Sequence, residues 1–541
     1  MRSKGDSEGT AKKKRQKGIR FFSVFGDALV SRFAKSALTR TLDPILAFPS
    51  NASRSQNRRE VHTVAIVPPA DDSPDAPAGV LTGSEDGFVL RAAARGDGAG
   101  AFFDPAEVGA HVGGAAVRAI ALVPDVPGGG LDVPPASEPP GSPSSSDPPP
   151  SPPSYILLTA GAKEVLHAWR VSWERASAPA PAPGSGSGVA WRLRTSLVAT
   201  RGSLVKAGHA EWTKGCGFVA ASVESDQRYM DVAGFVPVAG GGAVALAATS
   251  EGAVSAMALV PRRGTKTPPS GVPGGERTTS KKSGDRRTFS SSHSSVVWRA
   301  FADLKFHDRP VLAVDVAGVR VDGGGGEKKN VAVVAATGAT DGALAIWEIS
   351  DALPELIESE SSSSSVRTIR PCHVTRGAHQ SGVNGVAVRA VGGDAVGVFV
   401  AASGGDDQVA RCEVFVVKPS RKRTEATEET SSFCVVSLAR VAVAFAHSSA
   451  IKGVWLGPGT LPDTLTLATT SHDQRARVWT ASVETDAKDD DEKCSAAVFL
   501  TPVAGAFAEC PEPEGLDGFV DNRGRTRIAV CGRGVQMFEL E

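Results

Sequence analysis

Residues 465–480 read Leu-Thr-Leu-Ala-Thr-Thr-Ser-His-Asp-Gln-Arg-Ala-Arg-Val-Trp-Thr. Apolar residues alternate with polar or small ones on both sides of a polar turn at 471–474, which predicts two antiparallel strands joined as a β-hairpin. Asp473 lies six residues before Trp479, and His447 lies 26 residues before Asp473. Because a single hairpin of this kind is common, the fold depends on whether the layout recurs.

The layout does recur along the chain. Asp341 again lies six residues before Trp347, and Asp407 follows His379 by 28 residues. The predicted turns lie at residues 86, 163, 251, 341, 407, 473 and 533. Their steps of 60 to 90 residues exceed the roughly 40–45 residues of a minimal four-stranded repeat of this kind. The excess predicts long loops between strands.

Repeated hairpins with a His, an Asp and a Trp at these spacings resemble the WD-repeat family, whose blades are four-stranded sheets arranged as a propeller. In three turns Lys163, Glu251 or Arg533 stands in the place of the aspartate. The resemblance implies that the recurring side chains form a buried hydrogen-bonded network that pins each hairpin. The predicted network residues are His379, Asp407, His447, Ser471, Asp473, Trp479, Asp341, Trp347, Ser84 and Asp86.

The sequence therefore predicts an all-β fold, a single closed seven-bladed propeller over 41–541. A sheet that cannot cover its own faces must bury them against its neighbours, so the ring has to close. The chain ends after a third strand of the last blade, and we expect residues 42–49 to supply the missing outer strand. We place blade three at 227–259 and the start of blade four near 297–306.

Polar, Pro-rich or Ser-rich stretches interrupt the predicted blades and are too polar to fold alone. The predicted disordered loops lie near 124–154, 176–188, 262–294, 322–329, 358–366, 418–432 and 484–494. Residues 1–40 form a basic segment that we predict to be a disordered tail. A nuclear-import patch, a phosphate-binding arm and an organelle transit peptide remain as alternatives for this tail.

The composition provides no sign of chemistry. Lys plus Arg and Asp plus Glu both number 59, and the seven cysteines form no Cys-x-x-Cys pair. No phosphate-binding glycine loop and no His-x-x-x-His spacing occurs, and no apolar run approaches the roughly 18 residues needed to cross a bilayer. His447, Ser471 and Asp473 could suggest a hydrolytic triad, but a catalytic site is needed once and this set recurs. We therefore expect neither enzymatic activity nor a cofactor or metal, and no membrane partner.

A closer resemblance rests on the order of several short motifs. Gln-Arg-Tyr-Met at 227–230 is followed by Ala-Thr-Asp-Gly-x-Leu-Ala-x-Trp at 339–347 and Ala-His-x-x-Gly-Val-Asn at 378–384. Ser-His-Asp-Gln-Arg at 471–475 and Cys-Gly-Arg-Gly-Val-Gln-Met-Phe at 531–538 complete the series. This series resembles the C-terminal part of the WD-repeat subunit that partners an FtsJ-like tRNA 2′-O-methyltransferase. Members of that family are usually about twice this length, with more propellers upstream.

The resemblance implies a non-catalytic regulatory subunit that directs its FtsJ-like partner to the wobble ribose of the tRNA anticodon loop. It also implies that the same enzyme modifies a second anticodon-loop ribose through a different subunit. Anticodon loops are read by stacking and basic contacts, so Arg228, Tyr229 and the basic loop 262–287 are candidate contacts, although core packing is the favoured fate of Tyr229. The other functional classes are a general WD-repeat adaptor in ubiquitin-ligase, trafficking or chromatin assemblies, and a propeller hydrolase. We expect a cytoplasmic protein, with a nuclear location as the alternative that the basic tail offers.

Overall fold

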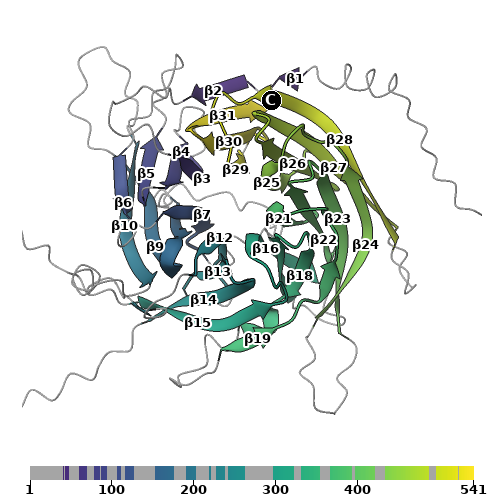
Figure 1. The fold of residues 1–541 in the computed structure, drawn as a ribbon, viewed down its shortest axis with the longest axis horizontal. Coiled ribbons are helices and arrows are strands. Elements are labelled where there is room, and N and C mark those ends of the chain that lie inside the picture. Colours follow the sequence, from purple (N-terminus) through teal and green to yellow (C-terminus); the bar gives the residue numbers. More distant parts are fainter. Residues whose placement is uncertain are drawn as a thin grey trace, which may run out of the picture.

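A computed structural model describes residues 40–41, 43–47, 60–69, 78–85, 87–93, 106–110, 116–126, 153–175, 191–202, 219–220, 227–237, 242–261, 296–321, 330–353, 366–392, 396–420, 433–486, 495–521 and 523–540. The described strands form seven sheets, which are arranged around a central axis as the blades of a propeller (Figure 1). Two single-turn 3-10 helices, Ala162–Glu164 and Ser350–Ala352, are the described helices. The predicted all-β propeller is confirmed.

The first four blades are formed by residues before 376. Blade one contains β3 (Val61–Val67), β4 (Gly79–Ser84), β5 (Phe88–Ala93) and β6 (Ala106–Ala110). Blade two contains β7 (Val117–Pro124), β8 (Ser154–Gly161), β9 (Leu166–Arg175), β10 (Trp191–Gly202) and β11 (Val219–Ala220). Blade three contains β12 (Tyr229–Phe235), β13 (Val244–Thr249), β14 (Ala253–Pro261), β15 (Val296–Lys305) and β19 (Arg367–Ile369). Blade four contains β16 (Val311–Val321), β17 (Asn330–Ala339), β18 (Leu344–Glu348) and β20 (His373–Thr375).

The last three blades follow in chain order and take two strands from the N-terminal end. Blade five contains β21 (Val383–Ala390), β22 (Val398–Gly405), β23 (Ala410–Pro419) and β24 (Phe433–Val443). Blade six contains β25 (Ile451–Pro458), β26 (Thr464–Ser471), β27 (Arg475–Asp486), β28 (Ser495–Phe507) and β1 (Arg40–Thr41). Blade seven contains β29 (Gly515–Val520), β30 (Thr526–Gly532), β31 (Gly534–Leu540) and β2 (Asp43–Ala47).

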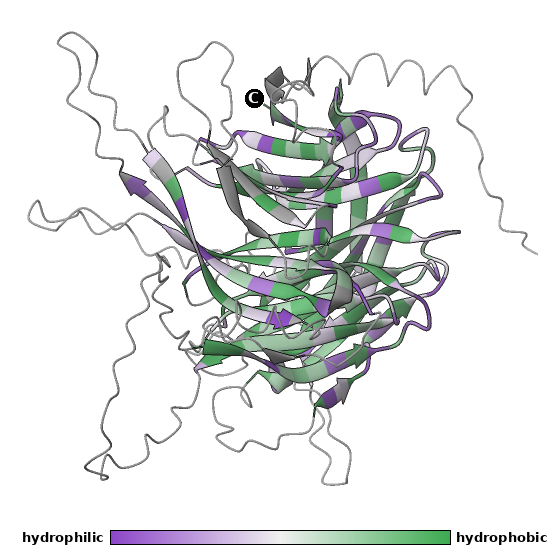
Figure 2. Ribbon diagram, turned by 60° about the vertical axis from the view of Figure 1, so that its left-hand side comes forward, coloured by the Kyte–Doolittle hydropathy of each residue, from purple (hydrophilic) through white to green (hydrophobic). Residues whose placement is uncertain are grey.

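The hydrophobic core lies between the blades. Seven clusters of buried side chains are found among the described residues, and each joins two neighbouring blades. The cluster between blades three and four contains Phe235 and Trp347, and the one between blades seven and one contains Met537 and Ile66. Hydrophobic residues accordingly concentrate on the strands and hydrophilic ones at many of the turns (Figure 2). No blade could bury its faces without both neighbours.

The ring is closed by contacts between the two ends of the chain. Strand β2 pairs antiparallel with β31, with Asp43 opposite Glu539 and Ala47 opposite Gln536. The backbone N–H of Ile66 in blade one also donates to the carboxylate of Asp517 in blade seven, at 2.8 Å across 451 residues of sequence. The prediction that the segment 42–49 completes the last blade is confirmed, and the exposed edge of β31 is removed.

Some predicted boundaries were wrong. The segment predicted to open blade four is β15, which pairs with β14 as an outer strand of blade three. The prediction missed this pairing because a long stretch of sequence separates Pro261 at the end of β14 from Val296 at the start of β15. Strands β23 and β27 continue to Pro419 and Asp486, past the predicted loop starts at 418 and 484. Strand β6 was not predicted.

Most of the predicted loops and residues 1–39 lie outside the described residues. No helix among the described residues is long and apolar enough to cross a membrane.

Deleting residues 1–47 tests the closure of the ring. The deletion removes β2 and leaves the backbone groups of β31 unpaired at an open edge. We expect a lower free energy of unfolding and self-association of the protein through that edge. Thermal denaturation and size-exclusion chromatography measure both quantities. A shorter deletion of residues 1–39 serves as the control, and equal melting temperatures and elution volumes for the two proteins would contradict the prediction.

Candidate functional site

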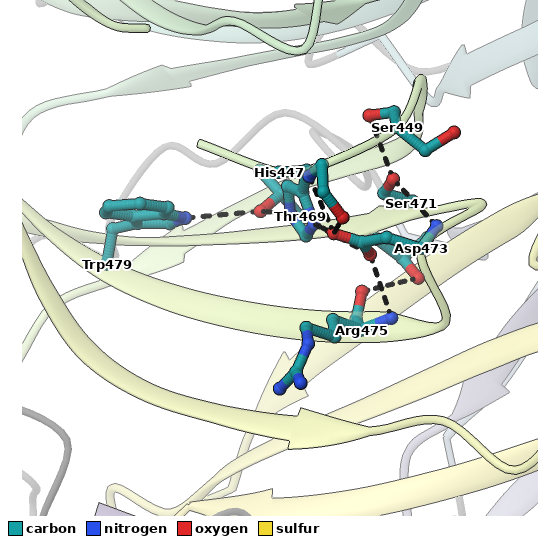
Figure 3. A network of polar contacts seen from close by, with 9 residues as sticks. His447, Ser449, Thr469, Ser471, Asp473, Arg475 and Trp479 are labelled. Atoms are coloured by element: carbon teal, nitrogen blue, oxygen red, sulfur yellow. Dashed lines mark hydrogen bonds and ion pairs between the residues drawn. The ribbon is translucent and has the colours of Figure 1, made fainter. Parts of the chain in front are cut away.

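The turn between β26 and β27 is held by a chain of hydrogen bonds, shown in Figure 3. The indole Nε1–H of Trp479 donates to the hydroxyl of Thr469 at 3.2 Å. Nε2 of His447 lies 2.9 Å from the same hydroxyl, and Nδ1 of His447 lies 3.0 Å from a carboxylate oxygen of Asp473. The network joins the segment before β25, which contains His447, to strands β26 and β27 of blade six.

The contacts of His447 are those of a neutral ring. The ionised carboxylate of Asp473 only accepts, so Nδ1 of His447 carries the hydrogen that lies between them. In the neutral ring Nε2 then accepts from the hydroxyl of Thr469. Burial lowers the pKa of His447 to about 4 in spite of the neighbouring carboxylate, which agrees with a neutral ring.

The carboxylate of Asp473 accepts further hydrogen bonds from backbone. The N–H groups of Ser448 and Arg475 donate to it, each at 3.0 Å. Burial alone would raise the pKa of this carboxyl, but the hydrogen bonds from Ser448, His447 and Arg475 hold it below its ordinary value. Asp473 is therefore an ionised acceptor that fixes both the link and the hairpin turn.

Two further blades contain the same arrangement. In blade four, His307 contacts Asp341 at 2.9 Å and Thr337 at 3.0 Å, and Trp347 donates to Thr337 at 2.9 Å. In blade five, His379 contacts Asp407 at 2.8 Å and Ser403 at 2.9 Å. Burial also lowers the pKa of His379, partly offset by Asp407.

Blade five differs at the tryptophan place. Residue Glu413 stands ten residues after Ser403, where blades four and six have Trp347 and Trp479 ten residues after a threonine. The Glu413 side chain is buried and accepts hydrogen bonds from the hydroxyls of Thr375, at 2.8 Å, and Ser437, at 2.7 Å. These bonds tie β23 to the outer strands of blades four and five, and a pocket of about 300 Å³ opens beside them.

The predicted network is only partly the observed one. Ser471 does not contact His447; its hydroxyl donates to the carbonyl of Ser449 and accepts from the N–H of Asp473. The link between histidine and tryptophan is Thr469, two residues earlier, so it faces the same side of the strand. His307, Thr337 and Ser403 were also missed. A threonine ten residues before a tryptophan occurs at 159, 288, 337 and 469, and this signal could have found the linking residue.

Blade one departs from the prediction as well. Ser84 is a buried residue of β4, and Asp86 lies outside the described residues. The neighbouring Glu85 contacts His62 at 2.6 Å and Arg118 at 3.1 Å. The turn is thus held by an acidic side chain, but that side chain belongs to Glu85 and not to the predicted Asp86.

The two candidate RNA contacts behave differently. Tyr229 is 1% exposed and packs in the core between blades two and three, and burial raises its pKa to about 12. The favoured fate of Tyr229, packing in the core, is confirmed, so this ring is not a surface contact. Arg228 is exposed at the start of β12. The basic loop 262–287 lies outside the described residues.

The central channel has a volume of about 1130 Å³ and is lined by the inner strands. Carboxylates on three of these strands accept hydrogen bonds from the backbone of the next blade. Burial raises the pKa of Asp231 to about 7 and that of Asp517 to about 6, although the bonds from the backbone lower both. The three bonds run from Val314 to Asp231 at 2.8 Å, from Val388 to Asp315 at 2.7 Å and from Ile66 to Asp517 at 2.8 Å. These groups hold the inner ring together.

The described part of the chain offers no group of three or more His, Cys, Asp or Glu residues that could hold a metal ion. In all three His–Asp pairs the hydroxyl opposite Nε2 is buried away from any substrate: Thr337, Ser403 and Thr469 are at most 1% exposed. The arrangement recurs in three blades, as a structural element would. The fold and these turns define a WD-repeat-like β-propeller.

Comparisons with known proteins support no narrower class. No family model matches the sequence, and no curated protein matches it. Among solved structures, a chain of the Chaetomium thermophilum Polycomb Repressive Complex 2 bound to GSK126 is 10% identical with a TM-score of 0.46, over 93% of this chain and 99% of that chain. The crystal structure of that complex and its apo form in an autoinhibited state give the same identity and TM-score, over 98% and 97% of those chains. Similarity this low indicates no function, and the fold rests on the strand pairing described above.

Replacing Asp473 with alanine tests the structural role of the network. The substitution leaves the N–H donors of His447, Ser448 and Arg475 without their acceptor. We expect the free energy of unfolding to fall by about 1–3 kcal/mol in urea denaturation. Glu251→Ala is the matched control, since Glu251 is an exposed residue at the corresponding turn of blade three. A variant that unfolds like the wild type but loses partner binding would show that Asp473 belongs to a binding site instead.

The neutral state of His447 predicts a pH dependence. Its pKa is about 4 in the folded protein against an ordinary value of 6.5, so between these values the unfolded chain binds the proton and the folded one does not. The free energy of unfolding should therefore fall as the pH falls from about 6.5 to about 4, by on the order of 3 kcal/mol from this residue. Urea denaturation across this range should show a shallower dependence for His447→Gln. Equal slopes for the two proteins would mean that His447 titrates normally.

Proposed function

We propose that this chain is a non-catalytic scaffold that binds an FtsJ-like methyltransferase and directs 2′-O-methylation of the tRNA wobble nucleotide. The observation that carries the proposal is the order of the motifs from 227–230 to 531–538, which resembles the regulatory subunit of that enzyme. Several of these motifs coincide with network turns, so the segment at 227–230 carries the most specific part of the resemblance. There the exposed Arg228 precedes the buried Tyr229.

The structure supports a positional role. Seven sheets closed by β2 and by the Asp517–Ile66 bond form a ring in which each blade is fixed by two neighbours. The His–Asp pairs are engaged in holding turns rather than in chemistry. A scaffold of this kind raises a reaction rate by holding an enzyme and its substrate in a productive orientation. The partner enzyme would supply the methyl-transfer chemistry.

Deleting the gene tests this function directly. We expect 2′-O-methylation to fall at the wobble nucleotide, measured by mass spectrometry of purified tRNA, because the enzyme is no longer oriented there. The second ribose methylation of the anticodon loop, which the resemblance assigns to a different subunit, is the internal control. Equal loss of both marks would indicate a general effect on the enzyme, and loss of neither would contradict the proposal.

The alternative is a general WD-repeat adaptor in a ubiquitin-ligase, trafficking or chromatin assembly, which the propeller fold would serve equally well. Affinity purification of the tagged chain separates the two. An FtsJ-like enzyme should co-purify if the proposal is correct. Cullin-adaptor, coat or chromatin proteins in its place would favour the adaptor.

A further inference from the structure

Two phenylalanine side chains are exposed at equivalent places on neighbouring blades. Phe445 is 81% exposed and Phe507 is 55% exposed. Each lies where the outer strand of its blade, β24 or β28, leads into the next blade, and each is followed by a buried alanine, Ala446 or Ala508. Both rings therefore lie on the same face of the propeller, where the links between successive blades run.

The backbone of Phe445 makes its presence there unexpected. Its φ angle is +55°, in the left-handed region that glycine adopts without strain. The corresponding residue of blade five is Gly377, with φ of +62°, and both residues stand two places before the network histidine. A glycine would satisfy the fold at position 445, and the exposed ring buries no core. A residue held against its backbone preference without benefit to the fold points to a contact outside the fold.

Two arginines lie on the strand beside Phe507. Arg475 is exposed and lies directly opposite Phe507 in the pairing of β27 with β28, and Arg477 lies opposite Gly505 on the same side. In Figure 3 the Arg475 side chain extends away from the His447–Asp473 pair. Arg477 keeps part of its surface exposed.

Blade five contributes two more arginines. Arg440 is exposed on β24, and Arg411 pairs opposite Ala442 of the same strand. None of Arg411, Arg440, Arg475 and Arg477 forms an ion pair with a described residue. The nearby Asp407 and Asp473 are engaged by histidines. Arg440 stands directly opposite the buried Glu413, whereas Arg475 and Arg477 bring positive charge to the strand beside Phe507.

We propose that this surface, the aromatic rim formed by Phe445, Phe507, Arg440, Arg475 and Arg477, binds single-stranded RNA. Unpaired bases stack on exposed aromatic rings while guanidinium groups contact the phosphates. The proposal rests on the proposed function, in which the RNA is the anticodon loop of the tRNA. A protein partner is less favoured, because the core of a protein interface is apolar and depleted in charge, whereas the exposed Arg475 lies directly opposite Phe507.

Phe445→Gly tests the rim without damaging the fold. The glycine relieves the left-handed backbone, so the melting temperature should stay the same or rise. The loss of one stacking surface should weaken binding of a fluorescein-labelled anticodon stem-loop RNA by roughly tenfold in fluorescence anisotropy. Arg475→Glu should weaken binding and reduce its salt dependence. The matched control is Phe499→Ala, which removes a ring that is 50% exposed near the other end of β28 and should leave RNA affinity unchanged.

The outcomes separate this inference from the function it rests on. No RNA binding by the full wild-type chain, or equal binding by wild type and Phe445→Gly, would overturn the rim as an RNA site. Loss of methyltransferase capture by Phe445→Gly with unchanged RNA affinity would overturn it in favour of a protein contact. If the rim binds RNA but gene deletion leaves wobble methylation intact, the RNA site stands and the proposed function fails. If methylation is lost on deletion but the rim does not bind RNA, the proposed function stands and the RNA site fails.

Discussion

Closure of the ring is the constraint on which the rest of this structure depends. Each blade exposes two apolar faces, and the seven inter-blade clusters bury them only if the last blade meets the first. Two kinds of bond make that junction: the pairing of β2 with β31, and the hydrogen bond from Ile66 to Asp517. The buried Asp231 and Asp315 make similar bonds between inner strands elsewhere in the ring. Polar groups are thus used where the strands converge and cannot accommodate large side chains.

The same residue types that form hydrolytic sites elsewhere are structural in this protein. In blade six, Trp479 donates to Thr469, Thr469 donates to His447 and His447 donates to Asp473, so each side chain has a hydrogen-bond partner. A buried network with all of its members satisfied makes a turn rigid, but it leaves no free base and no accessible nucleophile. Blade five keeps the histidine but has Glu413 where blades four and six have a tryptophan. Glu413 accepts hydrogen bonds from Thr375 and Ser437 and so connects β23 to the outer strands of blades four and five.

Much of the fold could be predicted from the sequence, because strand alternation and the repeated turns are local signals. The closing strand at 42–49 followed from counting strands in the last blade. The linking hydroxyl was misplaced from Thr469 to Ser471, two residues away on the same face of the strand, although only Thr469 has the ten-residue spacing to Trp479. The role of Glu413 could not be predicted, because a buried carboxylate is explained only by partners on other strands. The exposure of Phe445 likewise depends on tertiary structure, as its neighbours in sequence are apolar.

We propose that this closed ring acts by positioning an enzyme on its substrate. The most direct test is reconstitution of methyl transfer with the purified FtsJ-like enzyme, S-adenosylmethionine and an unmodified tRNA, with and without this chain. The account predicts that the chain alone transfers no methyl group, and that the enzyme methylates the wobble ribose efficiently only when the chain is added. Equal wobble methylation by the enzyme with and without the chain would contradict it.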